Sequence, residues 1–318
     1  MRALVFTGAG GSEVMRLEER PTPVPGEDSL VVAVRFAALN AADLAQRAGT
    51  YPAPPGAPSD IPGLEVAGVV AAVGARVTEF AQGDRVFGLV GGGGLADSVV
   101  VHERHLTRVP HTLSDEEAAA VPEAFITAHD AIVTQGRLAS GELLLVNGAN
   151  GGVGSAAVQI GLAAGARVIA SARTSLNQLS ELGAQALEPI EAFARAQAEG
   201  GADLILELVG APNLPPDLEA LAVRGRVAVV GTGAGADATV SLRTLMGRRG
   251  RIFGTQLRAR PLEQKAAAVQ AFAREVVPHL SAGRIRAVID NIFAVEEAAA
   301  AFEAMASRGK FGKILLAF

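Results

Sequence analysis

A strand-like run followed by a glycine-rich turn and a helix constrains the fold of this chain more than any other feature. The apolar residues 143–146 lead into glycines at positions 148, 151 and 154, and small apolar side chains then recur at helical spacing. In this order, one glycine permits a tight turn, one lets backbone amides approach a pyrophosphate, and one lets the helix pack closely on the strand. The sequence therefore predicts a dinucleotide-binding βαβ unit with the phosphates at the helix N-terminus.

The sequence contains neither of two other common glycine-containing motifs, the phosphate loop and the nucleophile elbow. The chain contains no GxxxxGK[ST] phosphate loop and no GxSxG nucleophile elbow, so neither a P-loop protein nor an α/β-hydrolase is expected. A turn that only packs a helix on a strand is the alternative to a nucleotide site. The turn residues predicted to contact the cofactor are Asn150, Gly151, Gly152 and Val153.

From about residue 115 onward, apolar runs alternate with Ala-rich stretches of helical spacing. Besides 143–146, the strand candidates are residues 167–170, 203–208, 226–230 and 251–254. Strands separated by helices indicate right-handed crossovers and a parallel sheet, and nearly continuous apolar runs indicate strands covered on both faces. The expected fold class is α/β, with a Rossmann doubly wound parallel sheet.

The first third of the chain has a different sequence pattern. Short apolar runs such as 30–36 and 66–73 alternate with Pro- and Gly-rich segments at 21–28, 51–63 and 91–94. Proline and glycine supply the backbone angles that turns require, so this part predicts an antiparallel β domain. A chain of 318 residues is long enough for two domains of roughly 150 residues each.

Composition excludes several classes of protein. The chain has no cysteine, which removes disulfides, cysteine nucleophiles and thiolate metal ligands. Its 28 Lys and Arg against 33 Asp and Glu give a net charge of −5, which argues against nucleic acid as a partner. No apolar run approaches the roughly 18 residues that span a bilayer, and no charged-then-apolar leader precedes the first strand-like segment. We therefore expect a cytoplasmic protein that binds neither membrane nor nucleic acid.

The end of the second predicted strand of the βαβ unit bears on the choice of cofactor. NAD-specific sites usually carry an acidic residue there, which binds the ribose 2′-hydroxyl. Here no Asp or Glu follows before Glu181, while Ser171 and Arg173 supply a hydroxyl and a cation that suit a 2′-phosphate. We expect NADPH as the cofactor; a solvated loop cation is the alternative role of Arg173.

Several segments together carry a resemblance to a known family. In chain order they are MRALVFTGAGGSEVMRLEE, LNAADLAQRAGTYPAPPGAPSDIPGLEVAGVV, GDRVFG, VNGANGGVGSAAVQIGLAAGA, GTQLRARPLEQK and GKILL. Over nearly its whole length, the chain resembles the zinc-independent quinone oxidoreductase family of the medium-chain dehydrogenases and reductases. The resemblance implies a GroES-like, mostly β catalytic domain into which the Rossmann domain is inserted. On this basis residues 1–118 and 262–318 form the catalytic domain, residues 119–261 form the NADP-binding domain, and two chains form a homodimer.

The same resemblance bears on metals. Zinc-dependent relatives place a cysteine near position 40 and a histidine near position 64, where this chain has Asn40 and Leu64. A catalytic zinc needs three protein ligands, and the pair His102 and His105 has no third candidate nearby. We expect no metal site, and the resemblance implies reduction of a quinone or of an α,β-unsaturated carbonyl compound (enone) by hydride from NADPH, with the protein supplying position and hydrogen bonds.

Family positions also imply roles for single residues at the nicotinamide end of the cofactor. Asn40 and Asp43 would orient cofactor or substrate, with Tyr51 on the loop beside them. A structural alternative is open for each: Asn40 and Asp43 suit the N-cap and N3 positions of a helix, and Tyr51 suits an exposed loop. The resemblance further assigns cofactor contacts to Thr127, Gly231 and Thr255, although a helical threonine such as Thr127 often bonds its own backbone.

Two departures from the family pattern concern the adenosine phosphate. Many members carry a lysine shortly after the second strand and a tyrosine after the third, whereas this chain has Asn177 and no tyrosine beyond Tyr51. Arg173 would have to substitute for them. The alternative function of another class is a non-catalytic NADPH-binding sensor or structural protein of the same fold. Metal-dependent alcohol oxidation is a third possibility, which would require a chelator-sensitive activity.

Overall fold

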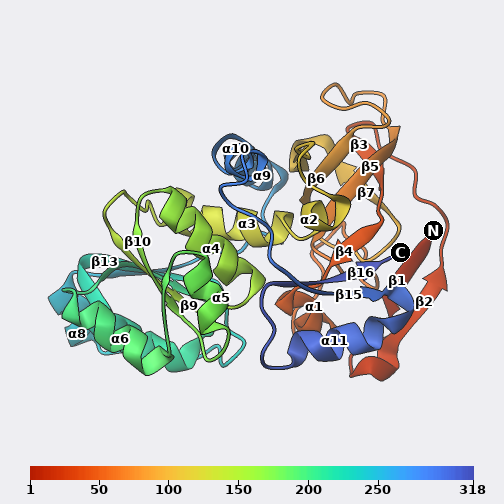
Figure 1. Ribbon diagram of the computed structural model, residues 1–318. Coiled ribbons are helices and arrows are strands. Elements are labelled where there is room, and N and C mark those ends of the chain that lie inside the picture. The colour runs from red at the N-terminus through yellow and green to blue at the C-terminus, as the bar shows by residue number, and fades with distance from the viewer. The chain divides into compact units, whose positions relative to one another are not determined.

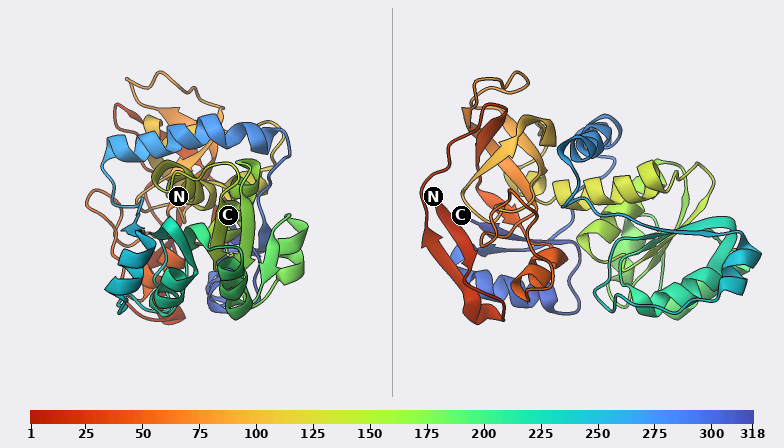
Figure 2. Two further views of the ribbon diagram at one scale, coloured as in Figure 1. Left: turned by 90° about the vertical axis from the view of Figure 1, so that its left-hand side faces the viewer. Right: turned by 180° about the vertical axis from the view of Figure 1, so that it is seen from behind.

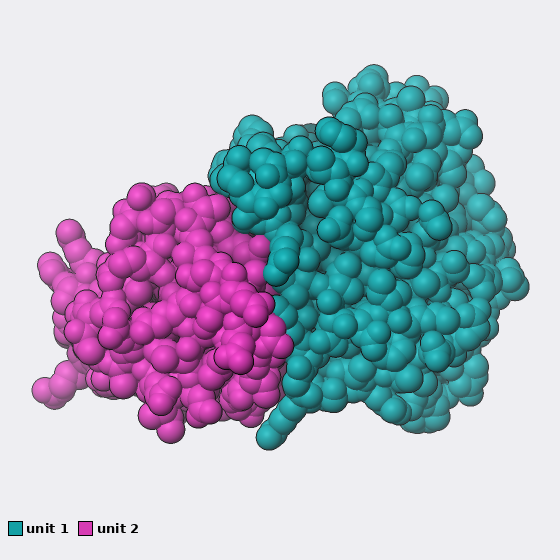
Figure 3. All heavy atoms as spheres, viewed as in Figure 1, with its two compact units in different colours: residues 1–126, 257–318 teal, residues 127–256 magenta.

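The computed structural model describes residues 1–318, which divide into two compact units (Figures 1 and 3). Unit 1 comprises Met1–Ile126 and Leu257–Phe318, and unit 2 comprises Thr127–Gln256. Unit 2 is therefore an insertion in the sequence of unit 1, as the fold class predicted. The units divide at 126/127 and 256/257, and the predicted domain boundaries at 118/119 and 261/262 stay predictions.

Unit 2 is built on one six-stranded parallel sheet. The strands are β9 (Leu143–Asn147), β10 (Arg167–Ser171), β11 (Gln185–Leu187), β12 (Ala202–Glu207), β13 (Leu221–Val229) and β14 (Arg251–Gly254). Their order is β11-β10-β9-β12-β13-β14, and every pairing is parallel. In chain order this is 3-2-1-4-5-6, the Rossmann arrangement, whose switch point lies between β9 and β12. The predicted doubly wound sheet is confirmed.

Helices connect these strands and cover the sheet (Figure 2). They are α4 (Gly152–Ala163), α5 (Leu176–Glu181), α6 (Pro189–Ala198), η4 (Ala211–Asn213), α7 (Leu214–Ala220) and α8 (Leu242–Arg248), preceded by α3 (Pro122–His129) and a π-helix, η3 (Asp130–Gln135). All five residues of β9 are buried, as expected for a central strand covered on both faces. Leu145, Ile169 and Ile205, from three neighbouring strands, belong to the core on one side of the sheet.

Unit 1 contains the predicted antiparallel β structure. Its five-stranded sheet has the order β7-β3-β5-β6-β8, formed by β3 (Ser29–Ala33), β5 (Glu65–Val73), β6 (Arg85–Leu89), β7 (Ser98–His102) and β8 (Leu106–Arg108). A hairpin joins β1 (Arg2–Phe6) and β2 (Met15–Glu19). The remaining helices of the N-terminal segment are η1 (Ser12–Val14), α1 (Ala41–Arg47), η2 (Glu103–His105) and α2 (Asp115–Ala119).

The C-terminal segment completes unit 1. It contains α9 (Leu262–Glu275), α10 (Val277–Ser281), β15 (Ile289–Ala294), η5 (Val295–Glu297), α11 (Ala298–Ala306) and β16 (Lys313–Ala317). β16 pairs in parallel with β15 and antiparallel with β4 (Phe36–Ala38), so the last strand of the chain binds an early one. Phe302 of α11 packs edge-on against Phe6 of β1, with ring centroids 5.8 Å apart. No helix in either unit is both long enough and apolar enough to cross a bilayer.

Candidate functional site

The glycine turn between β9 and α4 has the geometry that the sequence predicted. Gly148 has a φ of +74°, and the N–H groups of Gly148 and Ala149 donate to the carbonyl of Ser171, at 3.0 and 3.1 Å. A Cβ on Gly154 would lie 2.5 Å from the carbonyl oxygen of Gly148. Helix α4 can therefore begin this close to the turn only with glycine at position 154.

The start of α4 has the chemistry of an anion site. Its N-cap is Gly151, no side chain caps it, and its first turn contains no acidic residue. The first N–H groups of a helix lack intrahelical acceptors, and the helix dipole favours a negative group beside them. A Cβ on Gly151 would meet no atom closer than 3.8 Å, so the backbone is open to approach there. The turn fits a pyrophosphate, and contacts from Asn150, Gly151, Gly152 and Val153 stay predictions.

Next to the turn lies a buried polar cluster that sequence analysis missed. The side-chain amide of Asn147, the last residue of β9, donates to Glu207 Oε2 and to Asp217 Oδ1, both at 2.7 Å. Glu207, the last residue of β12, also accepts a bond from the N–H of Gly210, at 2.6 Å, and from Asn213 Nδ2, at 3.1 Å. The cluster thus ties the end of β9, directly before Gly148, to the end of the neighbouring strand.

Asp217 differs from Glu207 in its partners. It is fully buried, and Asn147 is the donor that the structure gives it. Burial, and then the charge of Glu207, raises the pKa of Asp217 to about 9, so this carboxyl is protonated at neutral pH. Asp217 Oδ2 and Asn147 Oδ1 are both buried without a hydrogen-bond partner. A protonated Asp217 can donate a hydrogen bond, which an ionised carboxylate cannot.

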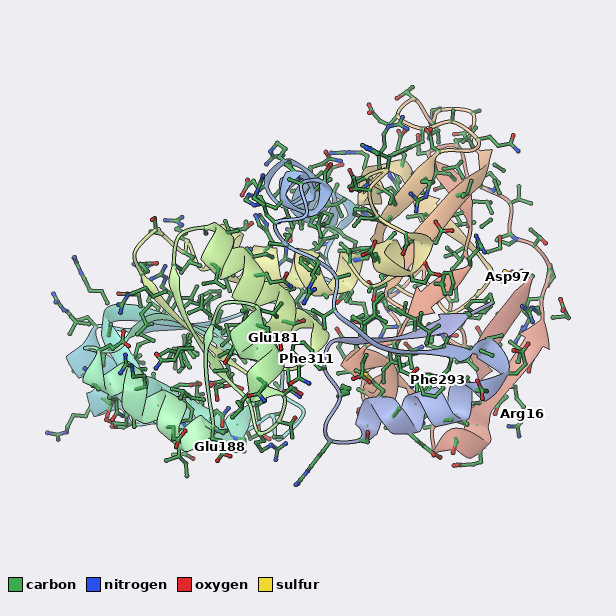
Figure 4. All side chains as sticks on the ribbon, in the orientation of Figure 1. Arg16, Asp97, Glu181, Glu188, Phe293 and Phe311 are labelled. Carbon is green, nitrogen blue, oxygen red and sulfur yellow. The ribbon has the colours of Figure 1, made fainter.

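The residues predicted to hold the 2′-phosphate follow β10. Ser171 ends this strand and is buried, whereas Arg173 is exposed and forms no ion pair. The first acidic residue after the strand, Glu181, is exposed at the end of α5 (Figure 4). The loop therefore offers a cation whose charge is not neutralised by a neighbouring carboxylate.

The other predicted cofactor contacts of unit 2 lie on α3 and after two strands. Thr127 is buried on α3. Thr255 follows β14, and its hydroxyl donates to Asp130 Oδ2 at 2.9 Å, a partner that sequence analysis missed. Gly231 follows β13, where a Cβ would lie 2.2 Å from the carbonyl oxygen of Leu208. Glycine at 231 therefore has a packing reason of its own, and its cofactor contact stays a prediction.

In unit 1, Asp43 has the capping role that the sequence offered as an alternative. Its Oδ2 accepts the backbone N–H of Asn40, the N-cap of α1, at 2.8 Å, and its Oδ1 accepts the N–H of Gly63 at 3.0 Å. Burial raises the pKa of Asp43 to about 6, against the lowering effect of these two bonds. Asp43 therefore fixes the start of α1 to the loop before β5, and its part in catalysis stays a prediction.

The side chain of Asn40 belongs to a second buried cluster. Its Nδ2 donates to Glu65 Oε1 at 2.8 Å, and its Oδ1 accepts a bond from Lys313 Nζ at 2.6 Å. Lys313 and Glu65 form an ion pair at 2.7 Å, with side chains only 4% and 2% exposed. Glu65 Oε2 accepts the N–H of Glu123 at 2.8 Å. Sequence analysis missed Glu65 and Lys313, although each lies within a segment that carries the family resemblance.

The donor set around position 40 does not fit zinc. The ammonium of Lys313 is bound to Asn40 Oδ1, and Leu64 offers no ligand atom. No group of three or more His, Asp or Glu side chains that could hold a metal ion occurs in either unit. His102 accepts the N–H of Arg104, and His105 Nε2 lies 3.1 Å from the carbonyl oxygen of Leu262. These side chains therefore provide no set of ligands for a zinc ion.

Tyr51 is held by an arginine that sequence analysis did not single out. The guanidinium of Arg258 lies 5.0 Å from the centroid of the Tyr51 ring, and it donates to the carbonyl oxygen of Tyr51 at 3.0 Å. It also donates to the carbonyl oxygen of Gly91 at 2.8 Å and to Gln46 Oε1 at 2.5 Å. Arg258 thus binds together two of the Pro- and Gly-rich loops of unit 1, at residues 51–63 and 91–94.

Comparisons with known proteins agree with this architecture. Residues 26–111 match the family described as "Alcohol dehydrogenase GroES-like domain", and residues 152–274 match "Zinc-binding dehydrogenase". The chain is 33% identical to the quinone oxidoreductase of Lama guanicoe, over 99% of this chain and 97% of that protein.

Solved structures give the same result. A quinone oxidoreductase of Pseudomonas syringae pv. Tomato DC3000 superposes with a TM-score of 0.89 at 27% identity, covering 100% of this chain and 99% of that one. A mycobacterial protein complexed with NADPH superposes with a TM-score of 0.89 at 25% identity, covering 100% of both chains. The chain belongs to the quinone oxidoreductase family of the medium-chain dehydrogenases and reductases, and it is an oxidoreductase.

Proposed function

We propose that this protein is an NADPH-dependent reductase that transfers hydride to quinones or α,β-unsaturated carbonyl compounds without a metal. The glycine turn carries the proposal, because its helix start is uncapped and its backbone at Gly151 is open to a diphosphate. Family membership and the solved relative with NADPH support a nicotinamide cofactor. A cytoplasmic location and a homodimer stay predictions from the sequence.

The residues of unit 2 divide into two groups along the proposed cofactor. Asn150, Gly151, Gly152 and Val153 bind the diphosphate, while Ser171 and Arg173 bind the 2′-phosphate of the adenosine half. Thr127, Gly231 and Thr255 contact the nicotinamide half. When bound, NADPH supplies a hydride from its nicotinamide ring to the acceptor.

Hydrogen bonds support the proposed roles of Asn40 and Asp43 in unit 1. Asn40 contacts the cofactor or acceptor and is held by Glu65 and Lys313. Asp43 acts by holding the backbone of Asn40, and Tyr51 contacts the acceptor. Both oxygens of Asp43 already accept backbone N–H groups, so we assign the proton that completes reduction to solvent.

Steady-state oxidation of NADPH tests the proposal with a panel of acceptors. We expect turnover with an ortho- or para-quinone or with a 2-enone, and no loss of activity on treatment with a chelator. A protein that changes the fluorescence of NADPH but turns over no acceptor would be the non-catalytic binder. Activity that vanishes with chelator and returns with zinc would contradict the metal-free mechanism.

A further inference from the structure

A pocket in unit 1 contains none of the residues assigned to the reductase site. It has a volume of about 460 Å³, within the usual range for small-molecule pockets. Its walls come from the loop at residues 54–58, the end of β6 with residues 89–92, β7, and the start of α9. The charged or titratable side chains of the lining are Arg258, Arg260, Lys265, His102 and His105, and no Asp or Glu is among them.

Lys265 is the most unusual residue of this lining. It lies in the first turn of α9, is only 6% exposed, and its ammonium donates to the carbonyl oxygen of Arg258 at 3.0 Å. An ammonium has three N–H donors, so two remain for other acceptors. Glu123 is the carboxylate whose charge acts on it and raises its pKa. Burial, the larger effect, lowers the pKa of Lys265.

A second buried cation lies beside it. Arg258 is 5% exposed, and its three hydrogen-bond acceptors, two backbone carbonyls and the amide of Gln46, carry no charge. Asp43 acts on Arg258 through its charge but accepts its own hydrogen bonds from backbone. Two desolvated cations whose hydrogen bonds involve no anion are costly unless an anion joins them.

We propose that this pocket binds a small organic acid, whose carboxylate, sulfonate or phosphate accepts hydrogen bonds from Lys265. The apolar body of such a molecule would lie against the wall formed by Pro54, Pro58, Leu89 and Val90. The anion gains charge-assisted bonds to an ammonium that is itself buried. This proposal does not depend on the reductase function.

Calorimetric titration of the full chain with naphthalene-2-sulfonate and with the neutral naphthalene-2-sulfonamide tests the proposal. We expect the sulfonate to bind more tightly than the sulfonamide. K265M should weaken sulfonate binding by about tenfold or more, leave sulfonamide binding unchanged, and be partly rescued by K265R. R274M removes an equal charge from the last turn of the same helix, outside the pocket, and should leave both affinities unchanged.

Equal affinity for the two probes, or equal sulfonate affinity in wild type and K265M, would overturn the proposal. If K265M does not fold, A57F provides the second variant, because Ala57 lines the pocket without bonding Lys265. Filling the pocket in this way should weaken sulfonate binding. Unchanged sulfonate affinity in A57F would place the bound anion elsewhere and reject the pocket.

Discussion

At the scale of single residues, the raised pKa of Asp217 makes the free energy of unfolding depend on pH. Its pKa is raised from 3.8 to about 9 in the folded chain, so the folded protein keeps a proton that the unfolded chain releases. The free energy of unfolding must therefore fall as pH rises from about 4 towards 9, by up to about 1.4 kcal/mol per pH unit. Below that window the contribution of Asp217 is fully present.

D217N isolates this effect, because an amide keeps the shape of the acid but cannot ionise. We expect D217N to unfold with the same or a larger free energy than wild type at pH 7, and the difference to grow between pH 5 and pH 8. Urea unfolding at several pH values measures it. Parallel pH profiles for the two proteins would show that Asp217 is already ionised in the folded state.

Arg173 is the residue on which the cofactor preference depends. It is exposed, so its removal should cost little stability. We expect R173A to weaken NADPH binding by about tenfold, the loss of a charge-assisted bond, and to leave NADH binding unchanged. R167A, at the other end of β10, is the control. If R173A weakened NADPH and NADH binding equally, Arg173 would not bind the 2′-phosphate.

What the sequence could predict at this scale depended on distance along the chain. The Asn40–Asp43 pairing was predictable as a cap, because helix geometry fixes the three-residue spacing. The bond from Lys313 to Glu65 joins residues 248 positions apart, and no local sequence pattern predicts such a contact. Arg258 was missed for the same reason, since its partner Gln46 lies 212 positions away.

At the scale of elements, apolar runs located many strands of both units to within a few residues. They missed β2 and β8 of unit 1, and β13 begins five residues before its predicted range of 226–230. Strand β14 was predicted with its observed bounds, and β9 and β10 each extend one residue further. Strand β11, at Gln185–Leu187, was missed because three residues give too short a pattern. The π-helix at Asp130–Gln135 was missed as well, since its longer hydrogen-bond step has no side-chain signature.

The glycine turn shows why an element can be predicted and its contacts cannot. The spacing of Gly148, Gly151 and Gly154 required a turn and a close helix, and the structure has both. The spacing does not say which glycine packs against neighbouring backbone and which faces open space; the structure does. A Cβ would clash with backbone at Gly154 but not at Gly151, so the two positions should respond differently to alanine.

At the scale of the whole molecule, the two ends of the chain meet in unit 1. β16 pairs with β4, and Lys313 brings its charge to Glu65 of β5 and to Asn40 at the start of α1. The sequence suggested that the C-terminal segment lies outside the central sheet, but only the family resemblance assigned it to the N-terminal domain. Strand pairing between distant segments depends on tertiary contacts that periodicity does not encode.

The stability of unit 1 should therefore depend on Lys313 in β16, the last strand. K313M leaves the carboxylate of Glu65 buried without its cation, which we expect to lower the free energy of unfolding by about 3–5 kcal/mol. The double variant E65Q/K313M removes both charges and should recover a large part of that loss. Thermal and urea unfolding measure both variants. A single variant as stable as wild type would show that the ion pair contributes nothing to holding the two ends together.

The central claim is that the backbone at Gly151 binds the diphosphate of NADPH, and titration of NADPH into wild type and G151A tests it most directly. G151A should fold with wild-type stability, because its Cβ meets no atom within 3.8 Å, yet bind NADPH at least about tenfold more weakly, because the Cβ occupies the space of the phosphates. A folded G151A that binds NADPH as tightly as wild type, or a wild type that binds none, would contradict the account.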